Sequence, residues 1–534
     1  MTHDTTLGRR SFLAGVGAAT GALVLPTVLT ATSTAAAAPT GAVVDPFTLG
    51  VASGDPLPQK VVIWTRLAPR PLQLDGGMPN RPVTVRWEVA KDEGFRNVVA
   101  RGAQEALPRF GHSVHVDVGG LRPHTYYWYR FRVRDQISPV GRTRTAPAIL
   151  SSPTVTLAFA SCSQYEHGYF TAYRRLAEDN PDIVFHLGDY IYEYGPGGFD
   201  SPTGNVRSHE GPEIRSLGDY RRRYAQYRTD PDLQLAHATA PFVVTWDDHE
   251  IDNNHAGNIP EDRDPAEGND TPENFALRRA AAYQAYWENM PFRPKRRPRF
   301  RRPTEFDLYR RFEYGRTASF HVLDERQYRT DQPCNDEFAN ACGEENDPDA
   351  TILGDEQATW LEDGLVGSQA AWQVVPQQIF MSNLDGQPGE GNAGYTDGWD
   401  GYRASRQRLL GFVRDQRVEN FVVLTGDVHS NWLSDLRFDF EDETSPVLGT
   451  EFVGTSITSG GDGSDQSSFF PFLQPENPHL RYNNNRRGYV RCTVDANEFR
   501  ADYRVVDVVS QPGAQVRTDK SFVVESGNPV ANDA

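Results

Sequence analysis

Three common catalytic motifs are missing from this chain of 534 residues: the Gly-x-Ser-x-Gly elbow, the P-loop and His-Glu-x-x-His. Serine-based acyl transfer, nucleotide triphosphate binding and zinc proteolysis therefore lack support. Basic residues are also outnumbered, because 54 Lys and Arg face 72 Asp and Glu, for a net charge of −18. This balance argues against nucleic acid as a partner, since a phosphate-binding face is normally basic. A small phosphorylated substrate stays compatible with it, provided that metal ions supply local positive charge.

Long apolar runs are absent except near the N-terminus, where the pattern predicts an export signal over residues 1–38. Arg9-Arg10 precedes an apolar run rich in Gly and Ala, and Ala35-Ala-Ala-Ala-Pro39 follows it. Paired arginines before such a run are typical of the twin-arginine pathway, and the run is too short and glycine-rich for a good membrane span. We therefore expect the twin-arginine machinery to export a soluble monomer, which is secreted or attached to the cell wall.

Cysteine is scarce, with four residues in the chain. Cys334 and Cys342 enclose a short loop and form a plausible disulfide in an oxidising compartment. Cys492 lies in an apolar strand pattern and is expected to be buried there. Cys162 ends another such strand, where pairing with Cys492 or metal binding as a thiolate are the alternatives; we favour metal binding.

The pattern of predicted elements changes near residue 150. Residues 43–150 alternate as half-buried strands, and the segment Gly120–Tyr129 is similar to the turn and corner tyrosine of fibronectin type III domains. Residues 154–525 instead mix apolar strands with helical segments, such as 272–290, and finish with closing strands. The sequence thus predicts a signal, a small all-β domain of the fibronectin-III or immunoglobulin type, and an α/β catalytic domain.

Four buried-strand patterns in the second region each end in a polar residue. Apolar runs without polar alternation suit strands covered on both faces, and ligands bind at the carboxyl ends of such strands. A single Asp in this position is usually a turn or a helix cap, but four tips of this kind indicate one shared site. The segments are 155–161 before Cys162, 183–187 before Gly188-Asp189, 241–246 before Asp247-Asp248 and 421–425 before Gly426-Asp427.

The polar residues at these tips offer two kinds of metal ligand. Carboxylates such as Asp189, Asp248 and Asp427 suit Ca²⁺, Mg²⁺ or Mn²⁺, whereas the thiolate of Cys162 and the imidazole of His429 suit a transition metal. Two neighbouring metal ions are the usual machinery for in-line displacement at phosphorus.

Four short motifs make the chain similar to a known family. Gly188-Asp-Tyr-Ile-Tyr192, Trp246-Asp-Asp-His-Glu250 and Gly426-Asp-Val-His429, with Phe159-Ala-Ser-Cys162 upstream, resemble the PhoD family of alkaline phosphatases and phosphodiesterases. This family is related to the purple acid phosphatases within the calcineurin-like metallophosphoesterases. The resemblance implies an α/β fold in which two mixed β-sheets pack as a sandwich flanked by helices.

The resemblance also implies a metal centre with one Fe³⁺ and one or two Ca²⁺ ions, with Mn²⁺ or Mg²⁺ as substitutes for calcium. Cys162, Asp189, Tyr192 and His429 match the iron ligands, and Asp189 is shared with the calcium side. Asp427 matches that side too, together with a residue between Asp248 and Asn254. We take Asp248 and Asn254 as the candidates, and Asn253 remains an alternative.

The reaction implied is hydrolysis of a phosphate mono- or diester by a metal-activated hydroxide. His249 could protonate the leaving group or bind the phosphoryl group, and its alternative is a structural histidine. Arg207, in the long loop 196–213, is the predicted phosphate clamp, and its alternative is a solvated charge. Asp324 and Arg326 provide support, since Asp324 ends another strand and Arg326 could balance charge.

Two competing functions remain open at this stage. The first is a diesterase of the same chemistry, resembling phospholipase D or acting on wall teichoic acid or nucleotide diesters. The second is a non-catalytic wall-binding protein with a structural metal site, although structural sites are usually closed by protein ligands.

Overall fold

The computed structural model describes residues 44–534, apart from 262–270, 299–304, 337, 341 and 390. The predicted export signal at 1–38 therefore lies outside the described residues. Within the part that is described, no helix is both long enough and apolar enough to cross a membrane.

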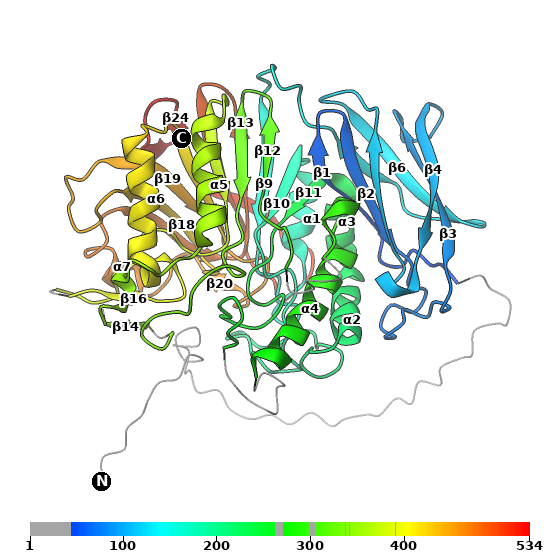
Figure 1. The fold of residues 1–534 in the computed structure, drawn as a ribbon, viewed down its shortest axis with the longest axis horizontal. Helices are drawn as coiled ribbons and strands as arrows, with labels where there is room; N and C mark the ends of the chain where they lie inside the picture. Colours follow the sequence, from blue (N-terminus) through cyan, green and yellow to red (C-terminus); the bar gives the residue numbers. More distant parts are fainter. Residues whose placement is uncertain (1–43, 262–270, 299–304, 337, 341, 390) are drawn as a thin grey trace, which may run out of the picture.

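Two large mixed sheets form the centre of the molecule (Figure 1). In the first, β9, β10, β11 and β1 are parallel neighbours, and antiparallel strands extend the sheet at both sides. The four apolar runs at the predicted site form β9, β10 and β11 here and β17 in the second sheet. In spatial order, the first sheet contains β25 (Ala531–Asp533), β24 (Val516–Glu525), β23 (Glu498–Val506), β22 (Gly488–Val494), β9 (Val155–Ala160), β10 (Ile183–His186), β11 (Pro241–Val244), β1 (Val51–Leu57), β2 (Lys60–Arg66) and β5 (Ser113–Gly119).

In the second sheet, β13, β15, β17 and β19 are parallel and the outer strands antiparallel. A separate pair joins β14 (Phe338–Asn340) to β16 (Ala393–Tyr395). The order of the second sheet is β12 (Arg310–Tyr314), β13 (Ala318–Val322), β15 (Trp372–Pro376), β17 (Phe421–Thr425), β19 (Val447–Val453), β18 (Asn431–Arg437), β21 (Leu480–Arg486) and β20 (Gly463–Ser464).

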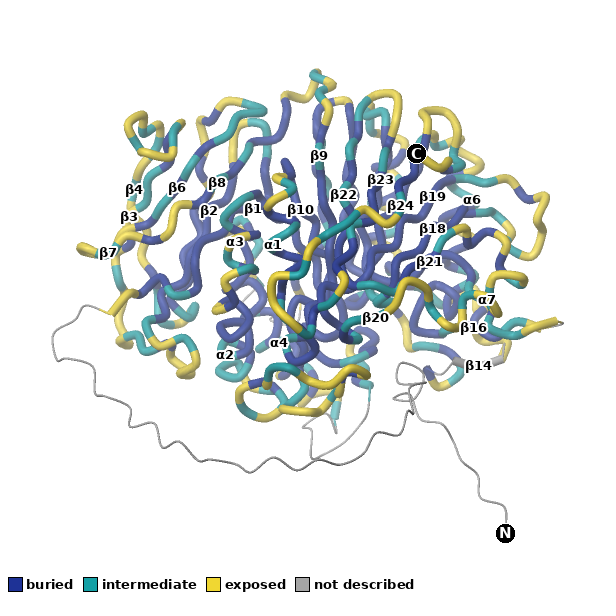
Figure 2. The backbone as a smooth tube through the Cα atoms, turned by 180° about the vertical axis from the view of Figure 1, so that it is seen from behind, coloured by how far each residue is buried: buried dark blue, intermediate teal, exposed yellow. Residues whose placement is uncertain are grey.

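The sheets pack face to face, and helices cover their outer faces. Between the sheets, Phe185 of β10 lies against Phe320 of β13, with ring centroids 4.7 Å apart. One helical layer packs on the first sheet and the other on the second. The central strands are therefore mostly buried, shown in dark blue in Figure 2. The first layer contains α1 (Thr171–Glu178), α2 (Leu217–Arg228), α3 (Pro231–Thr239) and α4 (Pro272–Asn289), and the second contains α5 (Gly354–Gly367) and α6 (Arg403–Asp415); α7 (Phe470–Leu473) is a single turn. The predicted sandwich is confirmed.

The N-terminal all-β region is built on two sheets. Its smaller sheet contains Tyr127, in the segment that resembles the corner tyrosine. The Tyr127 hydroxyl accepts a hydrogen bond from the Arg122 backbone amide at 2.9 Å. However, β1, β2 and β5 join the large sheet, because β1 pairs with β11. The sheet thus crosses the predicted domain division at residues 150–154, and that division stays a prediction. The smaller sheet consists of β4 (Val98–Ala106), β3 (Val83–Ala90), β6 (Tyr126–Val133), β7 (Gln136–Ile137) and β8 (Gly141–Arg144).

Candidate metal centre

The tips of the four strands meet, as the sequence predicts. After β9, the Cys162 amide donates to the Gly188 carbonyl at 3.1 Å. After β10, Gly188 has φ +113°, and a Cβ on it would lie 2.4 Å from the Cβ of Asp247. Only glycine permits this approach of the loops after β10 and β11. Across the sandwich, the same test on Gly426 after β17 gives 2.8 Å to the Ser161 hydroxyl oxygen.

Three overlapping groups of ligand atoms result, each with all its atoms within 4.8 Å. One contains Cys162, Asp189 and His429, and the opposite one Asp247, Asp248 and Asp427. The third, with Asp189, Asp248 and His249, links them. Asp189 therefore lies between a set with sulfur and nitrogen donors and a set with oxygen donors only.

On the first side, Tyr192 completes the donor set. Its hydroxyl donates to Asp189 Oδ2 at 2.9 Å and lies 3.2 Å from His429 Nε2. The Ser459 hydroxyl donates to the same tyrosine oxygen at 2.7 Å. Thiolate, phenolate, imidazole and carboxylate thus surround one point, a combination that suits a transition metal. We call Cys162, Asp189, Tyr192 and His429 the mixed-donor side.

On the other side, Asp247, Asp248 and Asp427 form what we call the carboxylate side. Buried Arg326 lies beside it, donating to Asp247 through Nε and approaching both Asp248 and Asp427 to 3.7 Å through Nη2. The Asn254 amide donates to Asp248 Oδ2 at 2.7 Å. Arg326 compensates part of the negative charge, as its sequence position indicates.

The two neighbouring asparagines, Asn253 and Asn254, have different hydrogen-bond partners. The Asn253 side chain donates to Glu261 at 2.8 Å, while its amide donates to Glu193. Asn254 contacts Asp248 and has φ +49°. Among the predicted alternatives, Asp248 and Asn254 therefore lie together on the carboxylate side.

Two features show that these residues fit bound cations. Buried oxygens, Asp189 Oδ1 and Asp247 Oδ2, have no hydrogen-bond partner among the described residues, although such atoms are costly to leave unpaired. In addition, five predicted ligands adopt the strained left-handed backbone that marks functional sites. They are Cys162, Asp189, Asn254, Asp427 and His429, with φ between 49° and 62°.

The charge of the site points in the same direction. Burial, reinforced by neighbouring carboxylates, raises the pKa of Asp189 and of Asp427 well above the ordinary value in the protein alone. Burial also raises the pKa of Asp247 to about 6, whereas Arg326 and His249 overcome burial and lower the pKa of Asp248. Burial and then Arg487 lower the pKa of His429, which favours the neutral imidazole that binds metals.

His249 lies at the edge of this cluster. Its Nδ1 is 2.8 Å from Glu193 Oε2, and its ring stacks on Tyr192 with centroids 4.2 Å apart. Burial opposes protonation, but Glu193, Asp248 and Asp189 outweigh it and raise the pKa of His249 well above its usual value. With Nδ1 held by Glu193, Nε2 is the nitrogen left for a substrate.

Arg207 requires a correction. Its Nη1 donates to Asp230 at 2.6 Å, its Nε to the Tyr165 carbonyl at 2.9 Å, and its Nη2 to the Gly168 carbonyl. Its guanidinium also stacks on the Tyr165 ring at 3.8 Å. All three nitrogens are engaged in holding the loop, so the structure does not support Arg207 as a phosphate clamp.

Sequence reasoning overlooked two acidic residues that support the site. Glu193 orients His249, and Glu250 accepts hydrogen bonds from backbone amides at two strand tips. Glu250 belongs to the motif 246–250, and Glu193 directly follows the motif 188–192. The sequence does not distinguish an acid that supports the site from one that binds metal. Only their contacts separate the roles.

The predicted disulfide between Cys334 and Cys342 is present, and Cys162 and Cys492 are free and buried. Cys492 lies in β22, as expected. The disulfide loop reaches the carboxylate side, because Asp336 Oδ2 accepts from Asn254 Nδ2 at 3.0 Å.

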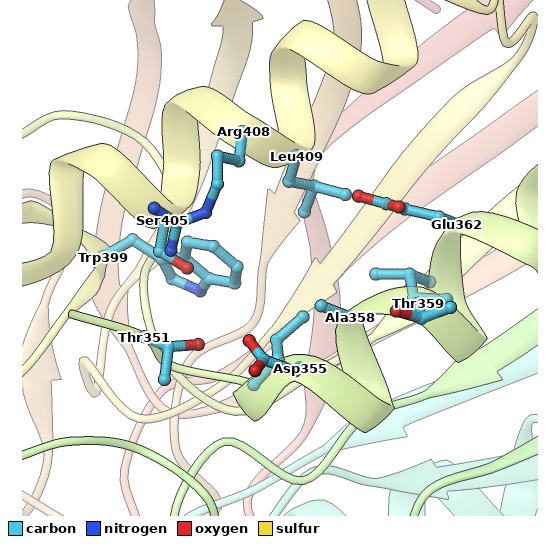
Figure 3. Close-up of a pocket in the computed structure, with 11 residues that line it drawn as sticks. Thr351, Asp355, Ala358, Thr359, Glu362, Trp399, Ser405, Arg408 and Leu409 are labelled. Carbon is cyan, nitrogen blue, oxygen red and sulfur yellow. The ribbon is translucent and has the colours of Figure 1, made fainter. Parts of the chain in front are cut away.

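A cavity of about 270 Å³ lies elsewhere, between α5 and α6 (Figure 3). Trp399 and Arg408 are on one side and Asp355 and Thr351 face them. None of its lining residues belongs to the metal groups.

Comparisons with known proteins agree with this geometry. Residues 157–503 match the family model of the PhoD-like phosphatase, and residues 32–147 match that of its N-terminal domain. Alkaline phosphatase D of Bacillus subtilis is 50% identical over 528 residues, covering 98% of this chain and 88% of that protein. A solved structure of PhoD is 51% identical, with a TM-score of 0.89 and 93% of each chain covered.

A more distant similarity concerns the fold alone. A purple acid phosphatase from yellow lupin is 13% identical, with a TM-score of 0.55, covering 89% of this chain and 74% of that one. The family models and the matches at 50% and 51% identity confirm the resemblance drawn from the four motifs. The chain belongs to the PhoD-like phosphatase family.

Proposed function

We propose that the protein hydrolyses phosphate esters at a two-metal centre, as an alkaline phosphatase or phosphodiesterase. The observation that carries this proposal is the position of Asp189, which belongs both to the mixed-donor group and to the group with Asp248. A shared carboxylate between two metals is the arrangement that in-line displacement at phosphorus uses. The alkaline phosphatase D relative supports the same activity.

The donor chemistry supports the proposed metals. Cys162, Asp189, Tyr192 and His429 would hold Fe³⁺, and Asp189, Asp248, Asn254 and Asp427 would hold Ca²⁺, or Mn²⁺ or Mg²⁺ in its place. When bound, such a pair acidifies water and stabilises negative charge on phosphoryl oxygens.

The protein's own residues would perform the remaining tasks. His249 Nε2 donates a hydrogen bond to the phosphoryl group or a proton to the leaving alkoxide, and Glu193 at 2.8 Å keeps the opposite nitrogen protonated. Arg326 compensates part of the negative charge of the carboxylate side. The remaining negative charge can hold a cation without repelling a phosphate completely. The buried walls exclude water and strengthen these interactions.

The export signal that the sequence predicts at residues 1–38 supports a secreted or wall-attached enzyme. Export in the folded state, which the twin-arginine pathway provides, would let the metals bind before translocation. We propose a monomer that acts on small phosphate esters.

The test combines metal analysis with kinetics on the mature protein purified without chelator. Iron and calcium are quantified, and a monoester and a diester of the same alcohol are assayed across pH, with calcium removed and restored. We expect iron in the protein and calcium-dependent hydrolysis at alkaline pH, and the preferred ester identifies the class. A metal-free protein that is inactive on both esters would overturn the proposal and favour the wall-binding alternative.

A further inference from the structure

The loops after β10 and β11 carry residues of both sides of the metal centre, and one side chain bonds to both loops. Glu250 is fully buried. Its Oε2 accepts from the Asp189 amide at 3.0 Å and from the Asp247 amide at 2.8 Å, while its Oε1 accepts from the Tyr190 amide at 2.5 Å. Both oxygens are thus used for backbone amides, and neither belongs to the candidate ligand groups.

We propose that Glu250 is a positioning residue that fixes the distance between the mixed-donor side and the carboxylate side of the centre. This inference rests on the proposed function, because it assumes that both sides bind metal. Asp189 precedes Tyr190 on one loop, and Asp247 precedes Asp248 on the other. A single carboxylate that holds amides of both loops sets how far Asp189 lies from Asp248.

The backbone at this point needs such support. Asp189 has φ +53°, a conformation that is strained for a non-glycine residue and persists only when its surroundings enforce it. Bound cations would keep Glu250 ionised, and its bond to the Asp189 amide is then charge-assisted and therefore strong. Gly188, one residue earlier, lets Asp247 approach the same loop. The two loops are thus in close contact and are also joined by the hydrogen bonds to Glu250.

A role in folding stability alone does not explain why position 250 is a glutamate. Glu250 adds a negative charge beside Asp189 and Asp247, which is unfavourable for folding unless cations compensate it. A neutral side chain with an acceptor would hold one of these amides at a lower electrostatic cost. The carboxylate is the group that can accept from all three at once.

The chain offers a matched control in Glu451. It is equally buried and accepts from the Met381 and Ser382 amides at 2.9 Å each. It also accepts from the Thr425 hydroxyl at 2.7 Å. Its partners include no candidate metal ligand, so Glu451 is a buried carboxylate that also accepts from backbone amides but holds no residue of the metal centre.

The experiment compares Glu250→Gln with Glu451→Gln in the full-length mature protein. A glutamine at 250 keeps the volume but turns an NH₂ group toward at least one backbone amide. We expect its calcium dissociation constant, measured by calorimetry, to rise by ~10–100-fold, as for other residues that support metal ligands. The KM for the ester at saturating calcium should stay near that of the parent, and amide hydrogen exchange around 188–190 should accelerate.

The control separates this role from general destabilisation. Glu451→Gln should lower the melting temperature but leave the calcium affinity and exchange at 188–190 unchanged. Equal calcium affinity in both variants and the parent would overturn the proposal. If Glu250→Gln does not fold, Glu250→Asp, which keeps the charge on a side chain one methylene shorter, is measured against Glu451→Asp by the same criterion. A parent protein without metal or activity would instead refute the proposed function.

Discussion

The two sides of the metal centre differ in how they balance charge. The mixed-donor side has one carboxylate, Asp189, beside the thiol, phenol and imidazole donors, and Arg487 bonds there to the backbone carbonyl of His429 at 2.8 Å. The carboxylate side gathers Asp247, Asp248 and Asp427 and keeps Arg326 against them. We therefore expect the first side to select the kind of metal through its donor atoms and the second to bind a cation mainly through its total charge. Variants of each side should have different consequences.

The largest effect is expected for Asp189→Asn, because this residue serves both sides. The variant should lose both metals and reduce hydrolysis by ~10³-fold, the order associated with removing a main electrostatic contributor. Metal analysis and kcat/KM measure this, with Asp435→Asn, a buried carboxylate on β18, as the control. Unchanged metal content and turnover would show that the assignment of the centre is wrong.

A smaller and more selective effect is expected for Cys162→Ser. A hydroxyl is a poor replacement for a thiolate, so iron should be lost while calcium binding persists, and activity should fall by ~10²-fold. Cys492→Ser is the matched control, since this thiol is also free and buried but lies in β22. It should reduce stability only, by about 1–3 kcal/mol for an unpaired buried hydroxyl. Loss of calcium together with iron in Cys162→Ser would contradict the independence of the two sides.

The carboxylate side and the neighbouring Glu250 should also make the free energy of unfolding depend on pH when metal is absent. Burial raises the pKa of Asp247 to about 6 and that of Glu250 to about 8. The folded state then binds more protons than the unfolded state between about pH 4 and pH 8, so stability should fall as pH rises through this range. Chelated protein should melt at a lower temperature at pH 8 than at pH 5, and calcium should remove the difference. A melting temperature of the chelated protein that rises toward pH 8 would contradict this account.

The smallest effect on chemistry is expected for Arg207→Gln, which lies outside both sides. Its ion pair with Asp230 is partly buried, so the variant should lose about 2–3 kcal/mol of folding free energy. The KM for the ester should be unchanged once the protein is folded. A KM that rises at least tenfold without loss of stability would restore the phosphate-clamp role.

Much of the site could be predicted because its ligands follow apolar strands directly. The runs before Cys162, Asp189 and Asp427 are continuous, and parallel strands bring their carboxyl ends together. Arg207 could not be assigned in this way, because a loop position does not specify which partner a charged side chain reaches. Its partner Asp230 caps α3, a helix that the sequence patterns had not identified.

The sequence by itself determined the fold class, predicted the disulfide and named the candidate residues of the metal centre, because periodicity and short motifs are local properties. The tertiary structure alone decided which acid joins two loops through their backbone amides and which acids gather with other candidate ligands. Asp248 and Glu250 are two positions apart in one motif, yet one joins the ligand groups and the other ties two loops together. It also decided that the sheet continues across residues 150–154 into the N-terminal region, since pairing of β1 with β11 depends on segments about 190 residues apart. Such long-range contacts leave no local signal in the chain.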